Sequence, residues 1–302
     1  MKYILMLLLT LPLIGTQAQN DKGISKLTTY EFDLQGHRGA RGLAPENTLQ
    51  AFREAIDIGV NTLELDVVVT KDRQLVVSHE PWMNADICKN LAGNTIDKET
   101  EKELNIYQMT YEEVKTYDCG STYYPAFPEQ KLESAYKPLL KEVLNMADNI
   151  SRNHGKKIKY NIELKSLPEG DDVYHPKPAE FVKLVIGLLQ LETKLERVNL
   201  QSFDFRILKA LHQSYPEVRL AALVYDMDFD TAINELGFLP EIYSPYFPLV
   251  SKDLVKDAHE SGMKVIPWTV NEPDQMKNLL KMGVDGLITD YPDRALKFKK
   301  ID

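Results

Sequence analysis

Residues 47–69 read NTLQAFREAIDIGVNTLELDVVV, and this stretch joins a helical pattern to a strand pattern. In its first half, three apolar residues fall on one helical face, namely Leu49, Phe52 and Ile56. Asn47 can cap the start of this helix, and Gly59 can end it. The second half is an apolar run whose only charged residues are Glu64 and Asp66. A helix followed directly by such a strand is the repeating unit of a parallel α/β sheet.

The same alternation continues along the chain. Nine segments have strand character, namely Phe32–Gly36, Thr62–Val69, Leu75–Ser78, Lys157–Leu164, Val198–Gln201, Leu220–Tyr225, Ile242–Ser244, Lys264–Thr269 and Gly286–Thr289. Helical patterns fall between most of them, at Leu139–Ala147, Ala179–Leu191, Phe205–Gln213, Ser251–Ser261 and Glu272–Lys281. We therefore predict an α/β fold of the TIM type, a (β/α)8 barrel.

Nine strands are one too many for that barrel. The turn that precedes Leu75–Ser78 is too short for a helical crossover. Either Leu75–Ser78 lies outside the regular barrel, or Ile242–Ser244 is not a strand, and the sequence leaves both alternatives open.

The composition limits the size and the partners of the protein. The chain has 302 residues, 45 Asp and Glu against 36 Lys and Arg, and a formal net charge of −9. This acidic balance argues against a generally basic surface, so we expect no nucleic-acid partner. The length fits one barrel domain over residues 19–302. Residues 81–138 are a long polar stretch that we interpret as an inserted lid segment at the mouth of the barrel.

The first 18 residues have the pattern of a signal peptide. Lys2 precedes an apolar run, and Thr16 and Ala18 supply small residues for cleavage after Ala18. The run is too short to span a bilayer, although an uncleaved anchor is the alternative. We therefore expect an exported protein without a stable membrane anchor, either periplasmic or secreted. In an oxidising compartment, Cys88 and Cys119 should form a disulfide.

Three carboxylates on two predicted strands suggest a metal site. Glu64 and Asp66 are two residues apart and so share a face of their strand, and Glu163 and Lys165 repeat this spacing on another. Inward-facing carboxylates are costly to bury without a positive charge. Oxygen ligands from two strands suit a hard cation, Mg²⁺ or Ca²⁺, better than zinc. The alternative is a solvated strand edge, or salt bridges to Arg38 and Lys165.

Two histidines and two cationic residues lie at the ends of the same predicted strands. His37 and His79 titrate near neutral pH, so as a pair they can act as general base and general acid. A lone histidine at a strand end is more often structural. Arg38 and Lys165 favour an anionic substrate such as a phosphate, which an arginine can bind with two hydrogen bonds.

Several of these residues lie in short motifs that occur in a fixed order. The chain resembles the glycerophosphodiester phosphodiesterase family in Gly36-His37-Arg38-Gly39, Ala44-Pro45-Glu46-Asn47-Thr48, Glu64-Leu65-Asp66-Val67, Ser78-His79, Ile162-Glu163-Leu164-Lys165, Gln201-Ser202-Phe203-Asp204, Pro267-Trp268-Thr269-Val270-Asn271 and Ile288-Thr289-Asp290-Tyr291-Pro292. The resemblance spans residues 35–292, which is nearly the whole chain after the signal peptide. Glu80 follows His79 where the family usually has Asp.

The resemblance implies a barrel enzyme that hydrolyses glycerophosphodiesters to glycerol 3-phosphate and an alcohol. It implies that His37 and His79 are the acid/base pair, and that a divalent ion is held by Glu64, Asp66 and Glu163. Arg38 and Lys165 would contact the phosphate. Glu46 would order water, the metal or the glycerol hydroxyls, and Trp268 would line the pocket near the glycerol, with ordinary core packing as its alternative.

Two other functions remain open at this point. One is a related barrel phosphodiesterase that acts on another phospholipid headgroup. The other is a non-catalytic protein that captures exported phosphodiesters, since a fold by itself does not fix a function. The sequence leaves the headgroup, the metal, the order of the two histidines, the occurrence of a cyclic phosphate and the oligomeric state undetermined.

Overall fold

The computed structural model describes residues 30–154 and 157–300. In these ranges the strands form one sheet in the order β8-β7-β6-β5-β4-β2-β1-β9, and β3 pairs with β2 beside this path. Their bounds are β1 Asp33–Gly36, β2 Thr62–Val69, β3 Leu75–Val77, β4 Lys159–Leu164, β5 Val198–Ser202, β6 Arg219–Val224, β7 Ile242–Pro245, β8 Lys264–Val265 and β9 Gly286–Thr289. Every pair along the path is parallel. The expected signal peptide, residues 1–18, lies outside the described residues.

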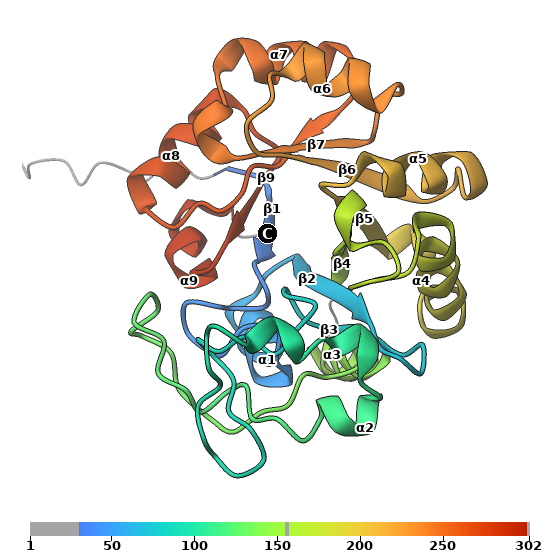
Figure 1. Ribbon diagram of the computed structural model, residues 1–302. Coiled ribbons are helices and arrows are strands. Elements are labelled where there is room, and N and C mark those ends of the chain that lie inside the picture. Colours follow the sequence, from blue (N-terminus) through green and yellow to red (C-terminus); the bar gives the residue numbers. More distant parts are fainter. Residues whose placement is uncertain (1–29, 155–156, 301–302) are drawn as a thin grey trace, which may run out of the picture.

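Backbone hydrogen bonds bring the two ends of this sheet together. The amide of Val270 donates to the carbonyl of Ile288 over 2.9 Å, and Ile288 donates to Pro267 over 3.0 Å. The result is a nearly closed barrel of eight parallel strands surrounded by helices (Figure 1), which confirms the predicted TIM-type fold. The predicted strand Lys264–Thr269 is shorter than expected, because only Lys264–Val265 forms a regular ladder with β7.

The ninth strand is β3, and β7 is a regular barrel strand. Residues 75–77 fold back on β2 as an antiparallel pair in which Val77 lies opposite Val67. A turn of five residues between β2 and β3 permits this hairpin but not a parallel crossover. The hairpin also brings Ser78 and His79 back toward Asp66, since the amide of Ser78 donates to the Asp66 carbonyl over 3.1 Å.

Apart from α2, which lies in residues 81–138, the helices alternate with the strands and cover the outside of the barrel (Figure 1). They are α1 Leu49–Ile58, α2 Tyr111–Val114, α3 Leu140–His154, α4 Pro178–Glu192, α5 Phe205–Ser214, α6 Phe229–Leu236, α7 Lys252–Glu260, α8 Pro273–Met282 and α9 Pro292–Ala295. Helix α6 is not among the sequence-based predictions. No helix in the described part of the chain is long and apolar enough to cross a membrane.

The N-cap of helix α1 lies one residue later than predicted. Thr48, not Asn47, is the N-cap, because its hydroxyl accepts from the amide of Ala51 over 3.1 Å. Gly59 ends the helix as predicted, with a positive φ of 103°. The side chain of Asn47 is thereby free for another role, which is a hydrogen bond to Asp66.

Side chains alternate between the two faces of the barrel strands. On β2, Leu63 and Leu65 join the main apolar core between sheet and helices, whereas Glu64 and Asp66 belong to the opposite, inward face. The barrel interior is divided between two kinds of side chain. One part is apolar, with Ala221, Ile242, Ile266 and Ile288 in contact, and the other is a buried amide network of Gln35, Asn161 and Gln201.

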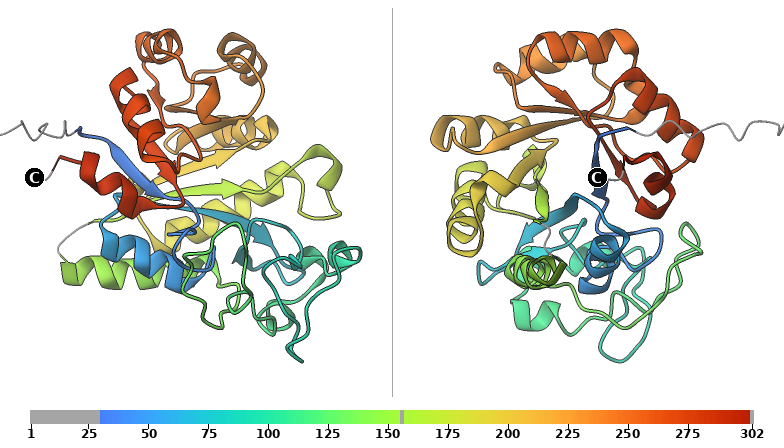
Figure 2. Two further views of the ribbon diagram at one scale, coloured as in Figure 1. Left: turned by 90° about the vertical axis from the view of Figure 1, so that its left-hand side faces the viewer. Right: turned by 180° about the vertical axis from the view of Figure 1, so that it is seen from behind.

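Residues 81–138 form an irregular segment beside β3 and α1 (Figure 1) and lie at the same end of the barrel as the loop after β4 (Figure 2). The segment has its own apolar cluster, which includes Met83, Ile106 and Val114 and also Val68 and Val76 of the barrel hairpin. Cys88 and Cys119 form a disulfide within this cluster.

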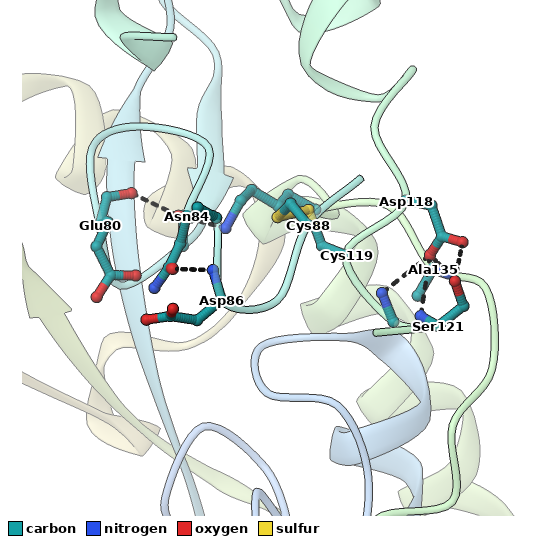
Figure 3. Close-up of a disulfide and its surroundings, with 12 residues drawn as sticks. Glu80, Asn84, Asp86, Cys88, Asp118, Cys119, Ser121 and Ala135 are labelled. Carbon is teal, nitrogen blue, oxygen red and sulfur yellow. Dashed lines mark hydrogen bonds between the residues drawn. A yellow bond between two sulfur atoms is a disulfide. The ribbon is translucent and has the colours of Figure 1, made fainter. Parts of the chain in front are cut away.

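The surroundings of the disulfide are held by backbone hydrogen bonds (Figure 3). The Cys88 amide donates to Asn84 over 2.9 Å, and the Cys119 amide donates to Ala135 over 2.6 Å. Beside it, the Asp118 carboxylate accepts from the amide of Ala135 over 3.1 Å and from the hydroxyl of Ser121 over 2.6 Å. Burial opposes the ionisation of Asp118, but these hydrogen bonds lower its pKa to about 2. The disulfide and the backbone hydrogen bonds between Lys89 and Asp118 therefore fix the two halves of the segment to each other.

Candidate active site

Three carboxylates converge at the carboxyl ends of β2 and β4. Asp66 lies opposite Glu163 in the strand register, and Glu64 is two residues before Asp66 on the same face. One carboxylate oxygen from each residue lies within 4.8 Å of the others, an arrangement that could hold a metal ion. Glu64, Asp66 and Glu163 are 2%, 1% and 6% exposed, so they do not form a solvated strand edge. The structure thus brings the three predicted metal ligands together.

The two predicted cationic residues contact the same carboxylates. The Lys165 ammonium donates to Glu163 Oε1 over 2.7 Å and lies 3.7 Å from Asp66 Oδ1. The Arg38 guanidinium Nε lies 3.4 Å from Asp66 Oδ2. Salt bridges and a possible metal site therefore occur in one cluster and do not exclude each other.

The three carboxylates affect one another's ionisation. Burial raises the pKa of Glu64 well above its ordinary value, and the charge of Asp66 adds to this effect. Burial also raises the pKa of Glu163 to about 7, although Lys165 acts in the opposite direction. For Asp66, burial is outweighed by the nearby charges of His79, Arg38 and Lys165, and its pKa is lowered. Full ionisation of all three is costly in this space, and a divalent cation would offset that cost.

Amide groups orient the carboxylates. Glu64 accepts from Gln201 Nε2 over 2.8 Å and from the backbone amide of Arg38 over 2.9 Å. Asp66 accepts from Asn47 Nδ2 over 2.8 Å. Both oxygens of Glu64 and one oxygen of Asp66 are therefore fixed by neutral donors. Such orientation by surrounding residues is typical of metal-binding carboxylates.

His37 follows β1 and is oriented by a carboxylate. Its Nδ1 lies 2.6 Å from Asp290 Oδ1, and Asp290 Oδ2 accepts from Asn271 Nδ2 over 2.7 Å. The Nδ1 proton therefore belongs to the bond with Asp290, and Nε2, which lies 4.0 Å from Glu64, can take up a proton. Burial lowers the pKa of His37, while the charge of Asp290 acts to raise it.

His79 follows β3 and has the same kind of support. Its Nδ1 lies 2.7 Å from Glu80 Oε1. Burial lowers the pKa of His79, and the positive charges of Lys165 and Arg38 lower it further. Both histidines are therefore favoured in the neutral form at pH 7 and have one nitrogen available for proton transfer. Glu80, which stands where the related family usually has Asp, supplies the carboxylate that orients His79.

These groups line one cavity of about 240 Å³. Its walls include His37, His79, Arg38, Glu64 and Glu163. Two imidazoles, acidic oxygens and a guanidinium therefore face the same enclosed volume. This arrangement can bind an anion beside a cation and can move protons on either side of it.

The loop after β1 holds two arginines at this cavity. Glu46 accepts from Arg38 NH1 over 2.8 Å and lies 2.6 Å from Arg41 Nε, so its carboxylate holds both guanidinium groups. The oxygens of Glu46 contact arginines here, and its expected role in ordering water, metal or glycerol stays a prediction. Arg38 has a positive φ of 50°, and Gly39 beside it one of 89°. Gly39 packs so closely against the Ala51 backbone that a β-carbon would not fit there.

Trp268 lies on the apolar side of the cavity. Its indole NH donates to the Ser244 carbonyl over 2.9 Å, and its ring meets that of Phe203 edge-on at 5.2 Å between centroids. It also packs against the apolar cluster in the barrel interior. Trp268 is therefore both a wall of the pocket and a residue that packs against the core.

Several residues of the site have no catalytic, metal-binding or substrate-binding role in the sequence analysis. They are Arg41, Asn47, Gln201, Asn271 and Asp290. All except Arg41 lie inside the motifs quoted above, which is the signal that could have identified them. Apart from Arg41, whose partner Glu46 is five positions away, their partners are distant in the chain, so no local pattern predicts those contacts.

Comparisons with known proteins show the family to which the chain belongs. Residues 37–294 match the model of the glycerophosphoryl diester phosphodiesterase family. A glycerophosphodiester phosphodiesterase from Bacillus altitudinis is 34% identical over 270 residues, which cover 87% of this chain and 96% of that protein. A glycerophosphodiester phosphodiesterase from Caldanaerobacter subterraneus is 30% identical over 86% of this chain and 94% of its own length.

Solved structures are also similar. A candidate glycerophosphoryl diester phosphodiesterase from Silicibacter pomeroyi has a TM-score of 0.79 and 30% identity, covering 91% of this chain and 96% of its own. An Oleispira antarctica phosphodiesterase, solved with the product sn-glycerol-3-phosphate, has a TM-score of 0.69 and covers 87% of this chain and 95% of its own. At 20% identity, the second structure supports the fold alone.

Proposed function

The chain is an enzyme of the glycerophosphoryl diester phosphodiesterase family, and we propose that it hydrolyses glycerophosphodiesters to sn-glycerol 3-phosphate and an alcohol by a metal-dependent mechanism with two histidines. One observation carries the proposal. His37 and His79 line the same cavity as Glu64 and Glu163, and each histidine has its Nδ1 bound by a carboxylate. A small-molecule phosphodiester is the substrate that this arrangement fits.

The proposed cofactor is Mg²⁺ or Ca²⁺, bound by Glu64, Asp66 and Glu163. The carboxylate oxygens fit a hard cation in kind and in mutual distance. The raised pKa values of Glu64 and Glu163 support this assignment, because a cation would favour their ionised forms. When bound, the ion supplies Lewis-acid polarisation of the phosphodiester and stabilises its negative charge.

The chain's own residues supply the remaining steps. Arg38 and Lys165 bind and orient the phosphodiester and stabilise the negative charge that develops on its oxygens. The Nε2 of one histidine takes the proton from the nucleophile, which is water or the glycerol 2-hydroxyl through a cyclic phosphate. The other histidine first takes up a proton from solvent on Nε2, as an imidazolium that its carboxylate partner stabilises, and then gives this proton to the departing alcohol oxygen. Asp290 and Glu80 hold the two rings in the tautomer that leaves Nε2 available.

The decisive assay measures glycerol 3-phosphate release from glycerophosphocholine, glycerophosphoethanolamine and glycerophosphoinositol. Mg²⁺, Ca²⁺ or a chelator is present in parallel reactions. We expect release that the chelator abolishes and a divalent ion restores. Full activity in the chelator would refute the metal dependence, and tight binding without turnover would indicate a binding protein.

Histidine variants test the proton-transfer roles. His37→Ala and His79→Ala should each lose most of their turnover and keep their circular dichroism spectrum. His259→Ala is the matched control, because His259 is partly exposed and contacts Asp285 on the outside of α7. Activity near that of the wild type in both active-site variants would refute the two-histidine mechanism.

We further propose that the chain is exported, that it is cleaved after Ala18, and that residues 19–302 form one domain in the periplasm or outside the cell. The Cys88–Cys119 disulfide supports this proposal, since such bonds persist in oxidising compartments. Cell fractionation and sequencing of the mature N-terminus test it. A protein that retains Met1 and remains in the cytoplasm would contradict it.

A further inference from the structure

A second cavity of about 470 Å³ adjoins the active site. It shares His79, Glu163 and Phe203 with the catalytic cavity. Its outer wall comes from two segments, the start of the insertion with Trp82 and the loop after β4 with Leu167. A substrate held at the acidic cluster therefore has a continuous path for one of its substituents into this second space.

The loop after β4 is a rigid wall. His175 is buried, its Nε2 accepts from the Leu167 amide over 3.0 Å, and its Nδ1 lies 3.0 Å from the Pro176 carbonyl. Gly170 packs so closely against this imidazole that a β-carbon would collide with it. Such a network fixes the position of Leu167 before any ligand arrives.

The insertion and this loop are joined above the cavity. Trp82 and Tyr174 meet edge-on with 5.6 Å between ring centroids. The side-chain amide of Asn105 donates to the Val173 carbonyl over 2.8 Å. The cavity therefore lies between two walls that direct contacts connect to each other.

The chemistry of the walls favours a neutral apolar group. Trp82, Leu167, Tyr174 and Phe203 present aromatic and aliphatic surface, and Leu167 is 52% exposed. The charged lining residues are of both signs, with Lys102 and Lys165 against Glu80, Glu163 and Glu169. A charged ligand group of either sign would therefore meet like charges on the wall, which a neutral group does not.

A quaternary ammonium group is disfavoured for a specific reason. The Lys102 ammonium already lies 5.3 Å from the centroid of the Trp82 ring. The aromatic face that would attract a ligand cation therefore has a cation of its own, and a second would be repelled. The cavity consequently lacks the free aromatic cage that a choline group requires.

We propose that this cavity is the subsite for the alcohol part of the substrate and that it selects alcohols with a neutral, apolar body such as an alkyl chain. This inference rests on the proposed function. In the reaction, an oxygen of water or the 2-hydroxyl forms the new bond to phosphorus, the bond to the alcohol oxygen breaks, and that oxygen receives a proton. His79 lines both cavities, so the departing oxygen leaves beside it.

The test compares glycerophosphoesters of ethanol, butanol and hexanol with glycerophosphocholine. Because burial of one methylene contributes about 0.8 kcal/mol, we expect kcat/KM to rise about fourfold per added methylene until the cavity is filled. Glycerophosphocholine should be a poorer substrate than the hexyl ester. Equal kcat/KM for all alkyl esters, or a preference for the choline ester, would overturn the proposal.

Variants assign the effect to the cavity. Leu167→Ala and Trp82→Ala should flatten the dependence of kcat/KM on chain length. Leu191→Ala is the matched control, since this leucine is 85% exposed on α4 and does not line the cavity. Lys102→Ala should narrow the difference between the hexyl and choline esters. An unchanged chain-length dependence in Leu167→Ala and Trp82→Ala would also overturn the proposal.

The outcomes separate this inference from the proposed function. If no ester releases glycerol 3-phosphate, the proposed function fails and the subsite fails with it. If the ethyl ester is hydrolysed and longer chains bring no gain, only the subsite is refuted.

Discussion

The contact between His37 and Asp290 makes a quantitative prediction for Asp290→Asn. The two side chains are 2.6 Å apart, and Asp290 is 3% exposed. When His37 takes up a proton, the carboxylate stabilises the imidazolium, whereas an amide oxygen has no charge to offer. A hydrogen bond to a charged group contributes about 1.5–3 kcal/mol. Since about 1.4 kcal/mol is tenfold in rate, kcat should fall about tenfold to 150-fold.

The same substitution should shift the pH dependence. The charge of Asp290 raises the pKa of His37 against the lowering effect of burial. Removal of that charge lowers the pKa of His37 further, so the limb of the pH–rate profile that reports this histidine should move to lower pH. KM should change little, because the His37–Asp290 contact lies within the protein.

The assay measures kcat and KM for a glycerophosphodiester between pH 5 and 9, with saturating metal ion. Asp253→Asn is the matched control, since Asp253 is exposed in the first turn of α7. A kcat within twofold of wild type together with an unshifted profile would refute the reasoning. It would show that Asp290 holds the ring without taking part in its charging.

Three further predictions concern stability. Burial raises the pKa of Glu163 to about 7 in the folded chain. Without metal, the free energy of unfolding of the wild type should therefore fall relative to that of Glu163→Gln as the pH rises from 4.5 through 7. Denaturant unfolding of both proteins in the presence of a chelator at pH 5 and pH 8 measures this difference, and the same difference at both pH values would contradict the prediction. Replacement of Cys88 and Cys119 by serine should lower the free energy of unfolding by about 3 kcal/mol, because the unfolded chain loses a closed loop; an unchanged urea midpoint would oppose this. Gly39→Ala should lower the free energy of unfolding by at least about 2 kcal/mol, since φ is 89° and the new β-carbon would lie 2.5 Å from the Ala51 carbonyl carbon. Gly93→Ala is the control, because φ is 79° there but the space is open, so this variant measures the backbone strain without the collision.

Much of the architecture is local information. The barrel follows from alternating strand and helix patterns, and the inward position of Glu64 and Asp66 follows from the two-residue period of a strand. Two local expectations were wrong in detail. Thr48 caps α1 in place of Asn47, whose side chain instead binds Asp66 on β2. The regular ladder of β8 with β7 ends at Val265.

The strand count could not be settled from the sequence. A short apolar run has the same period whether it lies in the barrel path or folds back as a hairpin, and only its pairing partner distinguishes the two. The pairing of Val77 with Val67 answers this question. It also explains the position of His79, which the hairpin returns to the carboxyl end of β2.

The sequence by itself determined the barrel and the kinds of chemical group at its mouth, because side-chain period and residue type are written along the chain. The tertiary structure alone decided which groups meet. Asp290 supports His37 from 253 positions away, Glu46 holds two arginines, and the insertion closes a cavity against the loop after β4. Contacts of this kind depend on where the closing barrel brings distant strand ends, and no local pattern encodes that distance.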